Sequence, residues 1–551
     1  MEERPPSAGL AAEASPAAKT PAPKKKPRKA PRRVTPDFFV HETDDDMLLI
    51  ISNVGEEQER PTRKVSKRKP EKAQRRKGLK RAASSRGKGG ALANQPLPSG
   101  GLGEGSKTFP SSAPPAAASS WGEQLPAEVL VQIFQQIVAS EGSVPFLCRV
   151  ARVCRLWYGA AADPVLWQKV SLGYCWAAPG QKWSPAVERR ALGTVEWLAG
   201  HRFSRLRDFA LCHWKQHVPF VLKEIGRCCP LLASLKLSHC SGVTAESLAA
   251  LAARCPRLES LNVQNSQVPS SAVVSFLEAA GSRIRHLWLT YSTQTSPVIA
   301  ALSNGSCPGL RLLEVNTEIK QSSQHFQLSI EQLQASCPHL QVLRLLNVVW
   351  SPKPVPRSAP HLQGFPELTE LCLATTSNSF VDDSTLGRIL WASERIRMLD
   401  LRGCFRVTPR GLQLLPCPDL EQLYLGLYGS SSPAHLPLEG SPLLTCKWSH
   451  SLQELDLAGQ RFREQDLEQA MTALAQGQSP KGGPPLRSLN LTGTKVMLST
   501  VSTLITSCPA LTYLNLSSCR HLPRGTKKAY RGQEEIRQCL HHLLTSAEEH
   551  L

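Results

Sequence analysis

The sequence predicts an α/β fold in which short strand–helix units stack side by side into a curved solenoid. The main observation is a phrase, Cys-Pro-x-Leu-x-x-Leu-x-Leu, that recurs through the C-terminal part of the chain. Its early copies return about every 26 residues, a unit too short to bury its apolar face without neighbours. Each copy begins with the period-2 alternation of a strand and continues with the spacing of a helix. The clearest copies begin at Cys229, Cys255, Cys307, Cys337, Cys417 and Cys508, and weaker ones are led by Leu206, Ile284, Leu368, Ile396, Leu452 and Leu486.

The first segment, residues 1–118, is rich in Pro, Ala, Lys and Arg and poor in aromatic residues, so we expect it to be disordered. The chain of 551 residues has a net charge of +20, and roughly half of that excess lies before Ser111. Two basic clusters, Lys24–Lys29 and Arg63–Arg81, predict nuclear import, with a cytoplasmic pool also allowed. A charge run that only solvates the chain is the alternative. Nucleic-acid binding is not expected, because no aromatic residues interleave the clusters.

Between the basic clusters, Asp44–Asp46 precede a short apolar run that favours β structure. An apolar run beside acids suits strand addition to the sheet edge of another protein. The pattern resembles a SUMO-interacting motif, which implies a contact with SUMO through Leu48, Leu49, Ile50 and Ile51. A transient local apolar cluster is the alternative. No apolar stretch reaches the length of about 18 residues that a membrane span needs, and the charged, Pro-rich start does not resemble a secretory signal.

Residues 119–171 predict a compact segment of three helices. The first helix begins near Pro126, a residue type favoured in the first turn, and the third begins at Asp163, which caps it. The second helix carries apolar residues at Leu147, Val150, Cys154 and Trp157. A segment this small is marginally stable alone, so we expect a partner to cover part of its apolar surface.

The strings Leu125–Phe134, Arg152–Trp157 and Pro164–Trp167 strongly resemble the F-box. The Cys-Pro repeats resemble the cysteine-containing leucine-rich repeats of the same superfamily. After about Trp121 the chain therefore resembles the F-box/leucine-rich-repeat family. This resemblance implies a non-catalytic substrate receptor of an SCF-type ubiquitin ligase, which docks on the Skp adaptor and through it joins the cullin and RING subunits.

Carried over to this sequence, the resemblance implies a docking face on the three helices. Some of its members must instead hold the helices together, and Trp157 is the first candidate for that role. The chain departs from the usual motif in a longer first interhelical stretch, Ala139–Pro145. The implied docking residues are Leu125, Pro126, Val129, Leu130, Ile133, Phe134, Val153, Cys154, Trp157, Leu166 and Trp167.

The repeats predict a horseshoe with its strands on the concave side. Residues 172–202 are expected to be a linker or N-terminal cap, and the repeats to run from 203 to 522. The residue between the two inward leucines of each strand points to the concave surface. This column contains Trp288, Arg344 and Tyr424, which we take as candidate substrate contacts because aromatic residues and arginine dominate binding hot spots. The alternative is that the two aromatic residues cover their own sheet. The column is Lys236, Asn262, Trp288, Glu314, Arg344, Cys372, Asp400, Tyr424, Asp456, Asn490 and Asn515.

Three spans interrupt the period and are rich in Pro, Ser or Gly, so we expect loops there. They are Trp350–Phe365, Gly429–Ser449 and Gln476–Pro485. Residues 523–551 are expected to form an amphipathic helix that caps the last repeat. Its apolar face would be Ile536, Leu540, Leu543 and Leu544.

No catalytic motif for metal-dependent proteolysis, phosphate binding or a nucleophilic serine occurs, so an enzyme is not expected. The 17 cysteines include no Cys-x-x-Cys pair and are expected to be reduced, buried residues rather than zinc ligands. His213 and His217 share a helical i, i+4 spacing, but nothing nearby completes a metal site. We expect no metal and no cofactor. The remaining alternative to a ligase subunit is a nuclear leucine-rich-repeat scaffold.

Overall fold

The computed structural model describes residues 125–173, 185–292, 295–317, 325–355, 363–376, 379–428, 439–480 and 482–548. The N-terminal segment 1–118 lies outside these residues, as do both basic clusters and the SUMO-interacting-like residues Leu48–Ile51. The expectations about disorder, nuclear import and SUMO therefore stay predictions.

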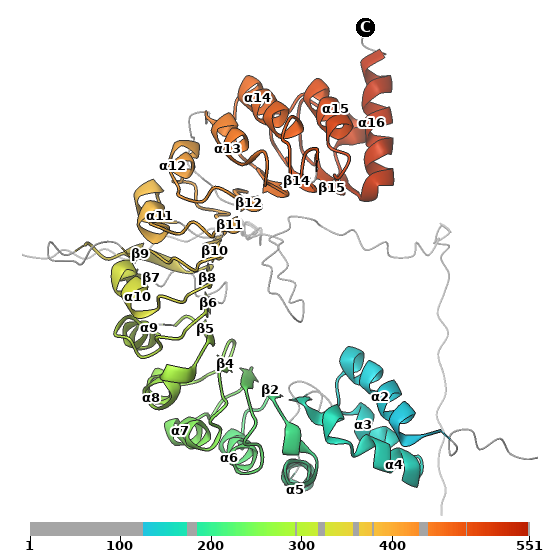
Figure 1. The fold of residues 1–551 in the computed structure, drawn as a ribbon, viewed down its shortest axis with the longest axis vertical. Coiled ribbons are helices and arrows are strands. Elements are labelled where there is room, and N and C mark those ends of the chain that lie inside the picture. The colour runs from blue at the N-terminus through green and yellow to red at the C-terminus, as the bar shows by residue number, and fades with distance from the viewer. Residues whose placement is uncertain are drawn as a thin grey trace, which may run out of the picture.

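The described chain forms one long curved sheet with helices along its outer side (Figure 1). Fourteen strands follow one another in the order β1-β2-β3-β4-β5-β6-β8-β10-β11-β12-β13-β14-β15-β16. Every neighbouring pair is parallel except β15 and β16, which are antiparallel. The strands are β1 (Lys169–Leu172), β2 (Asp208–Cys212), β3 (Ser234–Ser238), β4 (Ser260–Asn262), β5 (His286–Thr290), β6 (Leu312–Asn316), β8 (Val342–Leu346), β10 (Glu370–Cys372), β11 (Met398–Asp400), β12 (Gln422–Tyr424), β13 (Glu454–Asp456), β14 (Ser488–Asn490), β15 (Tyr513–Asn515) and β16 (Ala529–Arg531).

Helices on the convex side connect the strands, as right-handed crossovers between parallel strands require. Short 3₁₀ helices, η2 (Phe203–Arg205), η3 (Gly281–Arg283) and η5 (Arg524–Thr526), complete some connections. The α-helices of the solenoid are α5 (Pro185–His201), α6 (Val218–Cys228), α7 (Ala245–Arg254), α8 (Ser270–Ala280), α9 (Ser296–Ser303), α10 (Ile330–Ser336), α11 (Asp383–Ile389), α12 (Pro409–Gln413), α13 (Ser441–Trp448), α14 (Glu464–Ala475), α15 (Leu498–Ser507) and α16 (Gly532–Glu548).

The Cys-Pro phrase ends a helix and starts the next strand, as its sequence predicts. Cys229, Cys255, Cys337 and Cys508 are the C-caps of α6, α7, α10 and α15, because the following proline disfavours helical geometry at the preceding residue. Their side chains are buried. Thr244 caps the start of α7 through the backbone N–H of Ser247. The core is therefore continuous from one repeat to the next.

The N-terminal end of the molecule is a helical module of α2 (Ala127–Glu141), α3 (Phe146–Val150), α4 (Arg155–Ala161) and the 3₁₀ helix η1 (Pro164–Trp167). The single second helix expected through Leu147–Trp157 is wrong. Cys154 adopts an extended conformation and starts a new helix, α4, so the chain turns between α3 and α4. Asp163 caps η1 as expected, accepting a hydrogen bond from the backbone N–H of Val165.

The sheet begins at β1, and α5 lies within the segment 172–202 that was expected to be a linker or N-terminal cap. Two of the expected loops need correction. The span Trp350–Phe365 overlaps β9 (Val349–Pro352), which pairs with β7 (His325–Leu328) because Trp350 and Phe326 are both buried. The span Gly429–Ser449 contains α13, whose Trp448 is fully buried.

The last repeat is capped by β16 and α16, which cover the end of the solenoid (Figure 1). Ile536 and Leu543 are buried and Leu540 is partly buried, as the cap requires. Leu544 is exposed, contrary to its expected place on the apolar face. Among the described helices, we find none that combines the length and the apolar character of a membrane span.

Candidate adaptor and substrate surfaces

The helical module is held together by aromatic packing around Phe134. The Phe134 ring lies edge-on against Phe146, with ring centroids 5.6 Å apart, and against Trp157 at 5.4 Å. Trp167 packs on Phe203 of the solenoid at 5.9 Å, and its indole N–H donates to the Ala161 carbonyl at 2.8 Å. One continuous core therefore runs from α2 into the repeats.

Four of the implied docking residues are part of this core. Leu130, Phe134, Leu166 and Trp167 are at most 2% exposed, so they offer no surface to a partner. Their assignment to the docking face is corrected. One apolar helix face contains both core and surface residues, and spacing alone does not separate the two.

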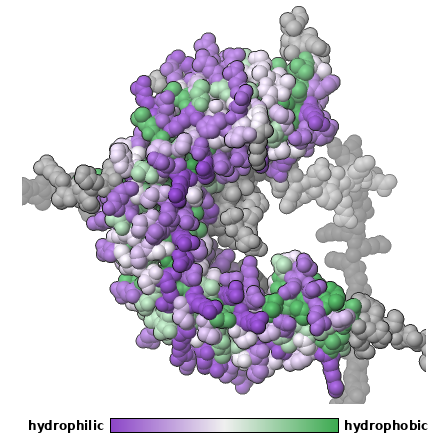
Figure 2. Space-filling view, in the orientation of Figure 1, coloured by the Kyte–Doolittle hydropathy of each residue, from purple (hydrophilic) through white to green (hydrophobic). Residues whose placement is uncertain are grey.

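The remaining docking candidates are accessible to different degrees. Val129, Ile133 and Val153 are 38%, 43% and 61% exposed, a high fraction for β-branched apolar side chains. Pro126 is also exposed, while Leu125, Cys154 and Trp157 are half-buried. Figure 2 shows hydrophobic residues gathered on the surface at the end of the molecule formed by this module.

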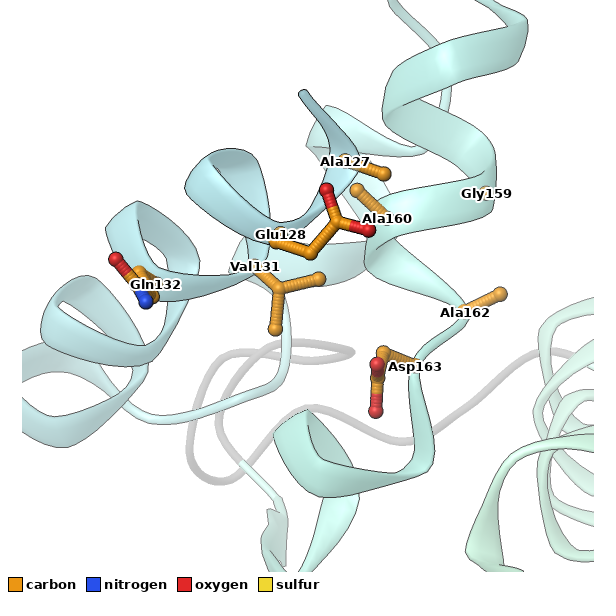
Figure 3. Close-up of a pocket in the computed structure, with 8 residues that line it drawn as sticks. All are labelled: Ala127, Glu128, Val131, Gln132, Gly159, Ala160, Ala162 and Asp163. Carbon is orange, nitrogen blue, oxygen red and sulfur yellow. The ribbon is translucent and has the colours of Figure 1, made fainter. Parts of the chain in front are cut away.

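A shallow cavity of about 460 Å³ lies elsewhere on the module, between α2 and the α4–η1 segment (Figure 3). Glu128 and Val131 line it from α2, and Asp163 lines it from the start of η1. At 100° per residue these α2 positions lie on a different side of the helix from Val129 and Ile133. The module therefore presents an apolar stripe and a separate groove with two carboxylates.

The strand register confirms the predicted concave column. The pairs Lys236–Asn262, Asn262–Trp288 and Trp288–Glu314 are neighbours on adjacent strands. The same register continues without interruption through Arg344, Cys372, Asp400, Tyr424, Asp456, Asn490 and Asn515.

Arg344 is not an available substrate contact. Arg344 is 8% exposed, and its guanidinium donates to Glu370 at 2.5 and 3.1 Å and to Glu314 at 3.2 Å. Burial raises the pKa of Glu314, against the hydrogen bond from Gln264 and the charge of Arg344. A buried, doubly paired arginine is held by its own sheet, so this assignment is corrected.

Tyr424 is also held by its own sheet. Its hydroxyl donates to Glu454 at 2.6 Å, and the Arg402 guanidinium lies 5.3 Å from its ring centre. Arg402 in turn pairs with Asp400 at 2.6 Å. These contacts favour the alternative interpretation, in which Tyr424 covers its own sheet.

Tyr428, which the sequence pattern did not identify, forms hydrogen bonds with the next part of the concave column. It follows β12 and reaches across two repeats, donating to Asp456 at 2.6 Å and accepting from Asn490 at 2.7 Å. Nothing in the periodic pattern identifies Tyr428, because it lies beyond the strand. Trp288 differs: it is half-buried, it lies 5.9 Å from His286 between ring centres, and it stays a candidate contact.

The pair His213 and His217 does not share a helix. Both residues have positive φ, 62° and 61°, in the turn between β2 and α6. His217 forms an ion pair with Glu188. In the part of the chain that the structure describes, no group of three or more His, Cys, Asp or Glu side chains is placed to hold a metal ion.

Comparison with known proteins gives three findings. A family model described as F-box-like matches residues 123–173. F-box/LRR-repeat protein 4 of Bos taurus is 25% identical over 258 residues, which covers 43% of this chain and 39% of that protein. The match thus spans less than half of the length of that relative.

Two solved structures are similar in fold. The yeast Rad7 and Elc1 complex contains a chain with 16% identity and a TM-score of 0.39, covering 77% of this chain and 87% of that one. LegL7 from Legionella pneumophila has 14% identity and a TM-score of 0.32, covering 60% of this chain and 96% of that one. The chain thus combines an F-box-like segment with a curved solenoid of strand–helix repeats, and part of it is similar to an F-box/LRR-repeat protein.

Proposed function

We propose that this protein is the substrate-recognition subunit of an SCF-type E3 ubiquitin ligase. The F-box binds the Skp adaptor, which links the chain to the cullin and RING subunits, and the leucine-rich repeats bind the substrate. Ubiquitin transfer takes place on other subunits, because members of this family are typically non-catalytic adaptors. The protein is therefore a receptor and not itself an enzyme.

The observation that carries the proposal is the exposed apolar stripe on the F-box. The side chains of Val129, Ile133 and Val153 are exposed to solvent. A module this small is marginally stable alone, so apolar side chains outside its core indicate a surface that a partner covers. A partner that covers such side chains gains roughly 25 cal/mol for each Å² of apolar area that it buries. The fused solenoid then leaves accessible side chains such as Lys236 and Trp288 on its concave sheet to bind a different protein.

Ile133→Asp combined with Val153→Asp is expected to abolish co-purification with the Skp adaptor. The changes place charges in a surface that would be dehydrated on docking, and neither side chain supports the core. The measurement is the amount of adaptor recovered with the tagged chain, together with the thermal unfolding midpoint of each variant.

Leu414→Asp is the matched control, because Leu414 is 80% exposed at the end of α12, far along the solenoid. It should retain the adaptor at the level of the unchanged chain. Full adaptor recovery with the double variant would exclude this face. A stably folded chain that never recovers the adaptor would favour the scaffold alternative.

A further inference from the structure

The concave surface has two unlike halves. From β6 to β14 the column is filled by pairs within the chain, such as Arg344 with Glu314 and Tyr428 with Asp456. From β3 to β5 the column contains Lys236, which is exposed, and Asn262 and Trp288, which are half-buried. A partner that approaches the concave side therefore finds accessible side chains mainly in the half next to the F-box.

A cavity of about 990 Å³ opens at the edge of this half, where β3, β4 and β5 end and the chain turns towards the helices. Its size is at the upper end of the range of about 300–1,000 Å³ that ligand pockets occupy. Val263, Val268 and Leu289 contribute apolar surface, and Lys215 and His239 are exposed to solvent at the cavity.

The polar parts of the wall are fixed before any ligand arrives. The Ser266 hydroxyl donates to the Leu237 carbonyl at 2.8 Å and accepts from the Cys240 N–H at 3.0 Å. The Thr290 hydroxyl donates to Asn316 at 2.7 Å and accepts from the Asn265 N–H at 2.8 Å. A preformed wall spares a ligand the cost of ordering these side chains.

Lys215 is the one residue with a formal charge at neutral pH among those that line the cavity in the described structure. Among the residues that line it in the described structure, none is Asp or Glu. The rings of His213 and His239 stack with centroids 4.5 Å apart. Burial lowers the pKa of His213, which favours its neutral form, and the nearby His239 and Lys215 lower that pKa further.

The acids of the same repeats lie elsewhere. Asp208 is the first residue of β2 and Glu259 precedes β4, so both lie at the opposite edge of the sheet. Glu246 is in the first turn of α7 and does not line the cavity. Lys236 extends the basic character from the cavity edge onto the concave sheet.

We propose that this cavity, with Lys215 and His239 at its polar side, binds an Asp- and Glu-rich segment of a protein partner that also inserts an apolar side chain. The inference rests on the proposed function, in which that partner is the substrate. A basic edge beside an apolar hollow selects a peptide with carboxylates next to a leucine-like residue, and rejects a basic one.

The test measures binding of labelled twelve-residue peptides to the purified full chain by fluorescence anisotropy. The first peptide has Asp and Glu around a central leucine, and the second replaces every acid by its amide. We expect a dissociation constant on the order of 10–100 μM for the acidic peptide. The amide copy should bind at least tenfold more weakly.

Two variants test the charge and the shape of the cavity separately. Lys215→Glu should weaken the acidic peptide about tenfold, since it reverses an exposed charge at the cavity. Lys223→Glu is the matched control, because Lys223 is equally exposed in the same repeat but lies on α6 on the outer side. Val268→Phe keeps the charge and fills the hollow, and should also remove binding.

Equal binding of the acidic and amide peptides would overturn the proposal, as would equal losses with Lys215→Glu and Lys223→Glu. A variant with Asp44→Asn, Asp45→Asn and Asp46→Asn tests the chain's own acidic segment as occupant. A tenfold gain of peptide affinity in that variant would assign the cavity to this segment and not to a partner. Adaptor recovery by Lys215→Glu, measured in parallel, keeps a failure here distinct from a failure of the proposed ligase role.

Discussion

At the scale of single residues, burial on the concave surface changes side-chain chemistry. Asp456 is buried, and this raises its pKa to about 6, although Tyr428 and the Ala458 N–H both donate hydrogen bonds to it. The neutral carboxyl is thus favoured in the folded chain more than in the unfolded chain. The stability that this preference contributes is present in acid and is lost as the pH rises to about 6.

Asp456→Asn is therefore expected to alter how stability depends on pH. The amide stays neutral, so the free energy of unfolding of the unchanged chain should fall by about 3 kcal/mol relative to that of the variant between about pH 3 and pH 7. Most of that loss should fall below pH 6, where the folded pKa lies. Chemical unfolding of both proteins at each pH measures the difference. Parallel stability curves across this range would contradict the burial argument.

The sequence predicted which residues line the concave surface but not which of them are free. The column was identifiable because alternation assigns one residue of each strand to the inner side. Whether Arg344 is accessible depends on acids in neighbouring repeats, such as Glu370, and Asp456 is likewise covered by Tyr428 from beyond a strand. Such pairings join residues 26 to 62 positions apart, and no local pattern carries them.

At the scale of elements, the Cys-Pro junctions determine where helices end and strands begin. The Cys255 thiol lies 3.5 Å from the Cys229 carbonyl of the preceding repeat, and the Cys337 thiol lies 3.7 Å from that of Cys307. Burial raises the pKa of Cys255 to about 11 and that of Cys337 to about 12. These thiols are therefore neutral packing groups and poor nucleophiles.

Alkylation of the native protein with N-ethylmaleimide should distinguish the two classes of cysteine. Among the described cysteines, Cys148 on α3 and Cys446 on α13 are exposed and should react first. The buried junction cysteines should react only when the repeats unfold, because the thiolate is both scarce and shielded. Mass spectrometry of a labelling time course reads each site. Early labelling of Cys255 or Cys337 would show that the junctions open in the native state.

Elements with a strong repeat were predictable, and those without one were not. The strands of the long sheet from β3 to β15 follow the leucine phrase, so their register could be derived. In contrast, β1 and α13 carry no Cys-Pro phrase, and their formation depends on partners distant in sequence, such as β2 for β1. The break between α3 and α4 was missed because apolar spacing continues through Cys154 while the backbone there is extended.

At the scale of the whole molecule, the joint between the F-box-like module and the solenoid determines how the proposed adaptor and substrate surfaces lie relative to one another. The two parts share the core contact of Trp167 with Phe203. On the surface, the Arg202 guanidinium lies 5.1 Å from the ring centre of Tyr158 on α4 and 5.1 Å from that of Trp197 on α5. A cation between two aromatic faces links the module to the first helix of the solenoid.

Arg202→Ala is expected to loosen this joint without unfolding either part. Exposed cation–π contacts are worth about 0.5–1 kcal/mol each, so the loss is enough to raise the local opening of α4 and of the last turn of α5 several-fold. Hydrogen exchange should therefore become faster in Arg155–Ala161 and near His201, and stay unchanged in α14.

Arg190→Ala is the control, because Arg190 is exposed on α5 away from both rings. If the two variants exchange alike, the Arg202 contact does not stiffen the joint and the Trp167–Phe203 packing alone sets the angle. If only Arg202→Ala accelerates exchange while adaptor recovery is unchanged, the rigid spacing between adaptor and substrate surfaces depends on this surface cluster as well as on the core.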